Sequence, residues 1–390
     1  MKPSPPSFFI LIALIGGLAI FSSTLSKTPV LPLFALALHA TPTEIGWIVM
    51  ASTLPGILIS FPAGALSDFL GRRRVLLAAL VVFATAPFLY LLVSNAWQLM
   101  AIRFYHGFAT AVFGTVASAA IAARYTTNRA AKLSTYSSIT IVGRSLAPFL
   151  GGFLISLASF DAVYIACAIS GVLALAAGLL LRDDAPTVAA KLEMPRFWRS
   201  LKTVLRDRRI MLVSIIEAAQ YLVFGAIEAF LALFAASLGL PAWQIGMILG
   251  VQLVSIVFTK PLMGKVSDRV GRKQVIIPGL LTGAASIVLL PYAPSFIGLT
   301  VLSLAFGLGF ATVTSSTTAL VADLTQNHRY GSSMGVLRTV MDVGQSIGPV
   351  LTGWMVGYAG YGSAFTLLAA ILLGAALLLG LLFKSDKRPG

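Results

Sequence analysis

Long apolar runs, separated by short polar turns, fill almost the whole chain. Twelve of these runs are about 20 residues or more in length, which is enough for an α-helix to cross the hydrocarbon core of a bilayer. They cover residues 8–36, 44–66, 74–94, 97–123, 135–158, 162–181, 210–238, 243–265, 274–293, 295–323, 334–358 and 362–383. The pattern predicts an all-α integral membrane protein with twelve transmembrane helices.

Composition supports the membrane assignment. Hydrophobic residues make up 58% of the 390 positions and charged residues only 11%, and the mean hydropathy is +0.92. A soluble domain carries about 25% charged residues, so most of this surface is expected to face lipid in the cell membrane. The single cysteine excludes a disulfide framework and any cysteine-rich metal site. We expect neither a metal nor a cofactor.

Among the loops between the runs, every second one carries positive charge. Lys and Arg follow the second, fourth, sixth, eighth, tenth and twelfth runs, and they are absent from residues 38–44, 94–97, 159–161, 237–243, 292–295 and 358–362. Cytoplasmic loops of membrane proteins are rich in Lys and Arg. The asymmetry therefore predicts cytoplasmic termini, and it accounts for the net charge of +15 without a nucleic-acid partner.

The longest polar stretch, residues 182–209, lies midway along the chain and is predicted to be a cytoplasmic linker. It separates an N-terminal six-helix bundle, residues 1–181, from a C-terminal six-helix bundle, residues 210–390. Within it, apolar residues fall on one face of a helix and basic residues on the other. This predicts a short amphipathic helix on the membrane surface. A plain linker and a regulatory element are both compatible with this pattern.

The two halves repeat one another. The segment GALSDFLGRR (64–73) returns as GKVSDRVGRK (264–273), and VGRSLAPFLGG (142–152) returns as VGQSIGPVLTG (343–353). Internal repeats of this kind build transporters in which two bundles surround a binding cavity. Rocking of the two halves about that cavity would give alternating access.

These motifs resemble those of the major facilitator superfamily over essentially the whole chain. The similarity rests on a loop signature that occurs twice, on Arg103 followed by Gly107 in the fourth run, and on a glycine motif in the fifth run that resembles the drug:proton antiporter branch. The loop residues are Gly64, Asp68, Gly71, Arg72 and Arg73, with Gly264, Asp268, Gly271, Arg272 and Lys273 in the second copy. The glycine motif comprises Gly143, Pro148, Gly151 and Gly152, with Ala147 in place of the usual Gly.

The resemblance implies roles that simpler structural explanations could replace. It implies that Asp68 acts as a latch between the halves on the cytoplasmic side, with the region of Ser332 and Ser333 as its receiver. Asp68 could instead cap its own turn, where a helix N-terminus favours an anion. The glycine motif implies a close contact between halves that prevents leak, whereas small residues also serve ordinary helix packing in membranes.

Charges inside the apolar runs are the strongest functional pointers, because each costs at least about 2.5 kcal/mol at the membrane centre. Glu217 is our first candidate for carrying a coupling proton and Asp342 the second, with Arg103 and Arg144 as further candidates. A carboxyl group in a low-dielectric cavity can hold a proton at neutral pH. Static ion pairs, Glu217 with Lys260 or Asp342 with Arg338, are the structural alternative.

Further residues are candidates for lining a substrate cavity: Lys27, His106, Tyr221, Phe224 and Glu228. In the first half the charges within the runs are all cationic, namely Lys27, Arg103 and Arg144. This favours an anionic, zwitterionic or neutral amphiphile over a lipophilic cation as substrate. His106 could equally be an interior histidine with satisfied hydrogen bonds, and Lys27 could extend its amine to the membrane surface.

The sequence predicts a secondary active transporter that works as a monomer, most simply a proton-coupled exporter of a small amphipathic compound. No phosphate-binding loop of the form G-x-x-x-x-G-K-[ST] occurs, so neither ATP hydrolysis nor another enzymatic activity is expected. One alternative is proton-coupled uptake of a sugar, organic acid or other metabolite. Another is a lipid translocase or a membrane sensor that does not transport.

Overall fold

The computed structural model describes residues 8–125, 127–181, 202–325 and 330–382. Within these ranges the regular secondary structure is helical throughout. The side chains of residues 60–66, 68–69 and 330–332 lie outside the described set. The chain forms two compact units.

Unit 1 comprises Met1–Ala40, Trp47–Lys191 and Pro241–Gly250. Unit 2 comprises Thr41–Gly46, Leu192–Leu240 and Val251–Gly390. The predicted linker falls largely on residues 182–201, outside the described residues, so its amphipathic helix stays a prediction. Near the C-terminal end of the linker, residues 202–206 are helical.

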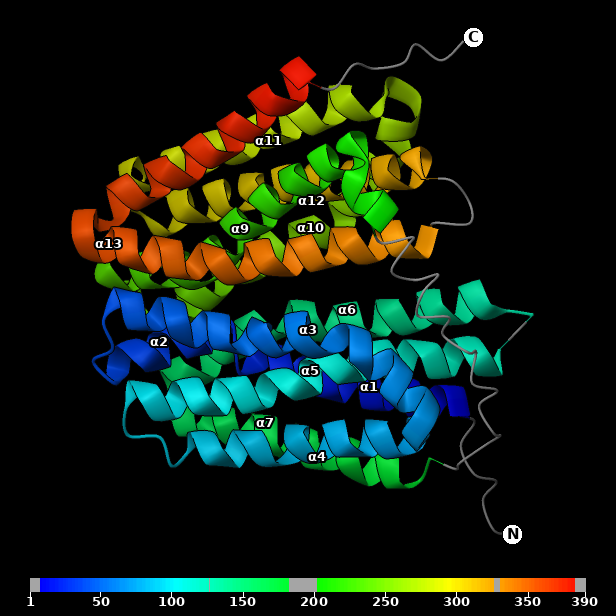
Figure 1. Ribbon diagram of the computed structural model, residues 1–390. Coiled ribbons are helices and arrows are strands. Elements are labelled where there is room, and N and C mark those ends of the chain that lie inside the picture. The colour runs from blue at the N-terminus through cyan, green and yellow to red at the C-terminus, as the bar shows by residue number, and fades with distance from the viewer. Residues whose placement is uncertain (1–7, 126, 182–201, 326–329, 383–390) are drawn as a thin grey trace. The chain divides into compact units, whose positions relative to one another are not determined.

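The helices of the N-terminal half are labelled in Figure 1. They are α1 (Phe8–Leu25), α2 (Val30–Ala37), α3 (Pro42–Leu70), α4 (Arg72–Tyr90), α5 (Ala96–Arg124), α6 (Arg129–Leu157) and α7 (Phe160–Leu179). The C-terminal half contains α9 (Arg208–Ser237), α10 (Ala242–Val270), α11 (Arg272–Val288), the short 3-10 helix η1 (Leu290–Tyr292), α12 (Phe296–Leu324) and α13 (Tyr330–Leu382).

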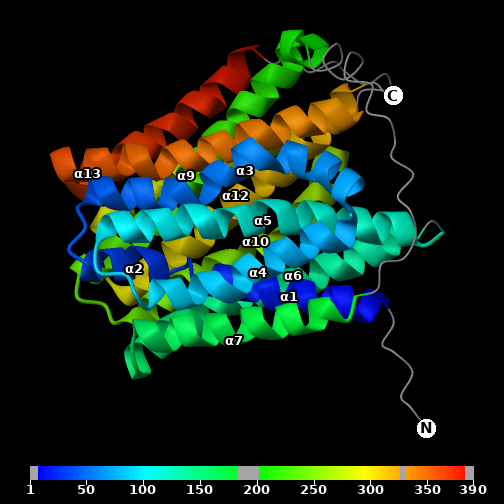
Figure 2. The same cartoon turned by 60° about the horizontal axis from the view of Figure 1, so that its bottom comes forward.

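Each unit repeats the same helix pairing. In unit 1, α1 packs on α6, and α4 packs on α5 and α7. In unit 2, α9 packs on α13, and α11 packs on α12 and α13. The α4–α7 pair and the α9–α13 pair can be followed in Figures 1 and 2. Fully buried side chains such as Ile12, Phe83 and Phe113 fill the core of unit 1.

Ten helices of the described chain are long and apolar enough to cross a membrane. Two features explain why this number is ten, whereas the sequence has twelve apolar runs. Helix α11 has only 17 residues, and α13 runs for 53 residues through a break at Gly360, where φ is 78° and ψ is 176°. The predicted count of twelve, and the cytoplasmic placement of the termini, stay predictions.

Helix boundaries follow from capping chemistry. The Ser159 and Ser295 hydroxyls and the Asn95 amide oxygen each accept a hydrogen bond from a backbone N–H in the first turn of the following helix. Such side chains satisfy donors that a helix start leaves unpaired. The sharp turns before α4 and α11 use Gly71 and Gly271, whose φ values of 89° and 111° favour glycine.

Glycines bring α13 into direct backbone contact with α9. A Cβ atom placed on Gly344 would lie 2.3 Å from the carbonyl oxygen of Ala218, and one on Gly348 would lie 1.9 Å from that of Leu222. Neither distance can accommodate a real side chain. The equivalent of Gly348 in α6 is Ala147, which is fully buried. The repeat therefore packs more closely in unit 2 at this position.

We predict that Gly348→Ala destabilises the protein by about 1–3 kcal/mol, because the added methyl group overpacks the α9–α13 contact. Thermal unfolding of the purified protein in detergent would measure the loss. The control is Gly335→Ala, on the same helix with nothing within 4 Å of its would-be Cβ. It should be neutral or slightly stabilising, since Ala favours helix over Gly. Equal unfolding temperatures for the two variants would contradict the close contact.

Candidate functional site

Glu217 is a fully buried carboxylate on α9. It follows the start of α9 by nine residues, or about 14 Å of helix, and so lies well inside an apolar helix. Its Oε2 atom contacts the Thr317 hydroxyl of α12, and its Oε1 atom has no hydrogen-bond partner. Lys260 of α10 interacts with it electrostatically. Glu217 therefore has Thr317 as the hydrogen-bond partner of one carboxyl oxygen, and its other carboxyl oxygen has none.

The contact between α9 and α12 is polar near Glu217 and aromatic about two helical turns further along α9. Glu217 meets Thr317, while Phe224 stacks on Phe310 with ring centroids 4.4 Å apart. Between these contacts, Gln220 carries a fully buried carboxamide, and neither its oxygen nor its nitrogen has a hydrogen-bond partner. Buried polar groups are normally paired. This stretch of the α9–α12 interface thus holds polar groups that are free to bind something else.

The single hydroxyl proton of Thr317 has competing acceptors. The Thr317 Oγ1 atom lies 2.9 Å from the Val313 carbonyl oxygen of its own helix and also contacts Glu217. When that proton goes to Val313, a hydrogen bond to Glu217 needs a proton on the carboxyl group. When Glu217 is ionised, it can accept the proton of Thr317 instead. The contact can therefore form in both protonation states of Glu217.

Asp342, the second proton-carrying candidate, lies on α13 and is half-buried. Arg338, one helical turn earlier, interacts with it electrostatically. No ion pair joins the two side chains within the described part of the chain, so the local salt bridge considered as the structural alternative is absent there. The polar contact recorded at Asp342 is its backbone carbonyl, which accepts a hydrogen bond from Ser346.

The three cations inside the spans of the first half lie in different environments. Arg103 on α5 is buried, and its Nη1 atom donates a hydrogen bond to the Tyr90 hydroxyl at 3.1 Å. Arg144 on α6 is exposed, and Lys27, in the turn between α1 and α2, is half-buried. Arg103 therefore belongs to a cluster inside unit 1, which also contains His106.

The remaining candidates for cavity lining lie on α9. Tyr221 and Phe224 form an aromatic group with Phe310, in which the Tyr221 and Phe310 ring centroids are 5.1 Å apart. Glu228, one turn beyond Phe224, is half-buried. Along α9, this apolar aromatic group therefore follows directly after the polar side chains of Glu217 and Gln220.

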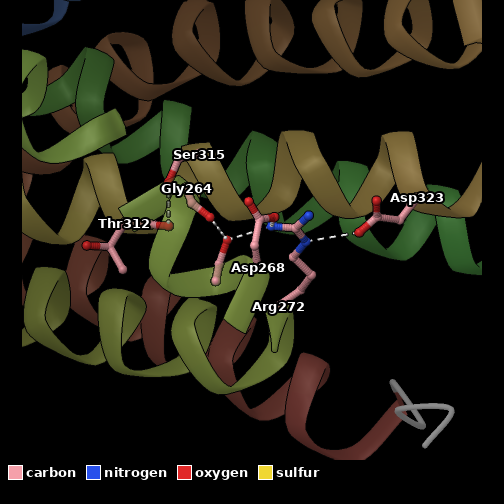
Figure 3. Close-up of polar contacts among 7 residues, drawn as sticks. Gly264, Asp268, Arg272, Thr312, Ser315 and Asp323 are labelled. Carbon is pink, nitrogen blue, oxygen red and sulfur yellow. Dashed lines mark hydrogen bonds and ion pairs between the residues drawn. The ribbon is translucent and has the colours of Figure 1, made fainter. Parts of the chain in front are cut away.

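The second copy of the loop motif forms a network within unit 2, shown in Figure 3. The Arg272 guanidinium binds Asp268 at 2.5 Å and Asp323, near the end of α12, at 3.0 Å. It also donates to the Ser267 hydroxyl, which donates to the backbone carbonyl of Gly264. Asp268 is thus engaged locally. The position in the first half that corresponds to Asp323 is Ala123, so the first copy lacks this acid.

The last basic residue of each loop copy holds the end of another helix. Arg73 donates from Nε to the Leu181 carbonyl at 2.5 Å and from Nη2 to the Leu179 carbonyl at 3.2 Å, just after and at the end of α7. Lys273 donates to the Gly380 carbonyl near the end of α13. Helix C-termini carry unpaired carbonyls and partial negative charge. The side chain of Asp68 lies outside the described set, so the latch stays a prediction.

The glycine motif of α6 packs against neighbours in unit 1. A Cβ atom on Gly143 would lie 3.2 Å from the Gly17 carbonyl oxygen of α1, and one on Gly151 would lie 3.0 Å from Val30 of α2. Gly152 lies against Gly246 of α10, and Gly246 also lies close to the Pro148 carbonyl oxygen. These contacts are those of close helix packing, and the role in preventing leak stays a prediction.

Thr317, Gln220, Tyr90, Tyr164 and Asp323 did not emerge from the sequence pattern. Gln220 could have been found, because it lies three residues from Glu217 and shares its helix face. The others contact their partners across helices more than ten residues away in sequence. A single sequence carries no signal for such pairings.

We predict that Arg73→Ala lowers stability by about 1 kcal/mol, because two carbonyls at the end of α7 lose a charged donor. Hydrogen–deuterium exchange of residues 175–181 should become faster. Arg74→Ala is the matched control, since Arg74 is the exposed neighbour in the same turn. Faster exchange in both variants, or in neither, would argue against the clamp.

The fold defines a class of protein: a multi-pass helical membrane protein built from an internal repeat. The profile of the Major Facilitator Superfamily matches residues 10–251 and 213–390. The chain belongs to this superfamily, and it is therefore a transporter of the cell membrane and not an enzyme.

Similar proteins agree with this assignment. An uncharacterized MFS-type transporter of Methanocaldococcus jannaschii, MJ1560, is 24% identical over 354 residues, covering 89% of this chain and 91% of the relative. The multidrug resistance protein MdtG of Escherichia coli is 24% identical over 356 residues, covering 88% and 87%. A crystal structure of the nucleoside transporter NupG superposes with a TM-score of 0.86 at 14% identity, covering 96% of this chain and all of that one.

Proposed function

We propose that the protein is a proton-coupled exporter of a small amphipathic compound, with Glu217 as its proton carrier. The observation that carries the proposal is the fully buried Glu217 carboxyl group, which contacts Thr317 through one oxygen and leaves the other without a partner. An ionised carboxylate buried in this way is costly, whereas the neutral acid is tolerated. Such a group exchanges its proton when its surroundings change.

The proposed cycle follows from this exchange. A proton that enters from outside occupies Glu217, with Asp342 as the second carrier, and favours the inward-facing state. Substrate then binds beside the polar groups of α9 and releases the proton to the cytoplasm. The release favours opening to the outside, where the substrate leaves. Gln220, with its unpaired carboxamide, is the residue we assign to substrate hydrogen bonding.

Relatives support export more than they define the substrate. MdtG is named as a multidrug resistance protein, which agrees with efflux of diverse compounds. NupG is named as a nucleoside transporter, and its likeness is one of fold. Proton-coupled uptake of a metabolite is therefore the second candidate function. A lipid translocase or a membrane sensor that does not transport is the third. It would fit if neutralising four residues together left function intact, namely Glu217, Asp342, Arg103 and Arg144.

The first test is Glu217→Gln, which keeps the shape of the side chain but cannot carry a proton. Energised cells that express the wild type should accumulate less of a transported dye than control cells, and an uncoupler should abolish the difference. The variant should lose this uncoupler-sensitive export. The control is Glu44→Gln, because Glu44 is a local partner of Thr41 at the start of α3 and Gln can also serve in such a cap.

Two outcomes would contradict the proposal. Uncoupler-sensitive export that survives in Glu217→Gln would remove Glu217 from the coupling. Higher dye accumulation in wild-type cells than in control cells would favour uptake instead.

A second prediction concerns the charge of the substrate. Lys27, Arg103 and Arg144 make the charges within the first-half spans cationic, so we expect export of the anionic dye carboxyfluorescein in preference to the cation ethidium. Fluorescence of cells loaded with each dye would measure the two rates. Faster loss of ethidium would overturn the preference but would leave the proton coupling of Glu217 untouched.

A further inference from the structure

Four polar side chains of unit 1 gather where α4, α5 and α7 meet, and none is more than 4% exposed. Arg103 and His106 come from α5, Tyr90 from α4 and Tyr164 from α7. Arg103 Nη1 lies 3.1 Å from the Tyr90 hydroxyl, which lies 3.2 Å from His106 Nδ1. The Tyr90 and Tyr164 rings stack with centroids 4.5 Å apart. The four side chains form one cluster, here called the α4–α5–α7 cluster.

One hydrogen-bond direction in this cluster is fixed by its donor, and the other depends on the histidine tautomer. A guanidinium can only donate, so the Tyr90 oxygen accepts from Arg103. The bond between the Tyr90 hydroxyl and His106 Nδ1 runs in either direction. When Tyr90 donates to Nδ1, neutral His106 carries its proton on Nε2, and that nitrogen is a donor without a partner. When Nδ1 donates to Tyr90, Nε2 is an acceptor without a partner.

Three buried polar atoms of the cluster lack a hydrogen-bond partner. They are the Nε–H of Arg103, the hydroxyl of Tyr164 and His106 Nε2. The Arg103 N–H can only donate, the Tyr164 hydroxyl has a proton to donate, and His106 Nε2 is a donor in one of its two tautomers. A single anion could accept from all three, and this composition is that of an anion site.

Charge balance leads to the same conclusion. Arg stays protonated in proteins, so Arg103 cannot become neutral as a buried carboxylic acid can. A buried charge without a partner of opposite sign is strongly destabilising. In the described residues no carboxylate pairs with Arg103. Asp161 is the acid on α7, and it lies exposed in the first turn of that helix.

We propose that the α4–α5–α7 cluster binds one small monovalent inorganic anion, which would be chloride in the cell. One negative charge neutralises Arg103, and the Arg103, His106 and Tyr164 donors surround the ion. The four side chains are at most 4% exposed, and Phe83 packs edge-on against His106 with ring centroids 5.5 Å apart. This burial favours a small, weakly hydrated ion over a bulky organic acid. The anion joins three helices and goes beyond the proton chemistry proposed for Glu217.

The test is thermal unfolding of the purified full chain in detergent, with sodium gluconate replaced stepwise by sodium chloride at constant ionic strength. A ligand that binds the folded state raises the unfolding temperature with its concentration. We expect that rise with chloride and bromide, and none with sulfate. Tyr164→Phe keeps the stacked ring but removes one donor, so it should raise the chloride concentration needed for the half-maximal shift about tenfold.

The matched control is Tyr105→Phe on α5. The Tyr105 hydroxyl lies 2.9 Å from the Thr85 hydroxyl, outside the cluster. It should keep the wild-type chloride response. Arg103→Leu should remove the response altogether. If Arg103→Leu fails to fold, Tyr164→Phe still decides the question.

An unfolding temperature of the wild type that is the same in gluconate and chloride would overturn the proposal. So would a Tyr164→Phe variant with wild-type chloride affinity, or an equal loss in Tyr105→Phe. The measurement needs no transported substrate, so a negative result would leave the export function of Glu217 standing.

Discussion

The bilayer offers no water to an ion, and this constraint governs where the protein can place charge. Every charged group inside a span must be neutralised by a proton, a partner or a bound ion, or must reach the membrane surface. Glu217 and Arg103 meet the constraint in opposite ways. Glu217 can take up a proton, whereas Arg103 keeps its charge, and we propose that a bound anion neutralises it. The proposed coupling in unit 2 and the proposed anion site in unit 1 both follow from this difference.

The helices and the internal repeat could be predicted from the sequence because both depend on local or periodic signals. A run of apolar residues must become a helix in lipid, since the backbone has to satisfy its own hydrogen bonds there. The doubled loop motif indicated two similar halves, and the helix pairing is repeated in the two units. The family resemblance of these motifs is confirmed by the superfamily match.

Contacts between helices could not be predicted in the same way. The bond of Arg73 to the carbonyls after α7 and that of Arg272 to Asp323 join positions far apart in sequence. The burial of Glu217 followed from its apolar surroundings, but its partner Thr317 is one of many hydroxyl residues on α12. Likewise, the alternative ion pair between Asp342 and Arg338 has the right spacing on one helix, yet spacing alone does not bring the two side chains together.

The backbone contact of Gly344 and Gly348 with α9 has a practical consequence for measurements of motion. These two segments are expected to move together, because sliding would bring the Ala218 and Leu222 carbonyl oxygens of α9 against residues of α13 that are larger than the two glycines. A pair of spectroscopic labels on α9 and on the part of α13 before Gly360 would therefore keep a constant separation throughout a working cycle. The separation of this pair would serve as an internal reference for distances measured to any other helix.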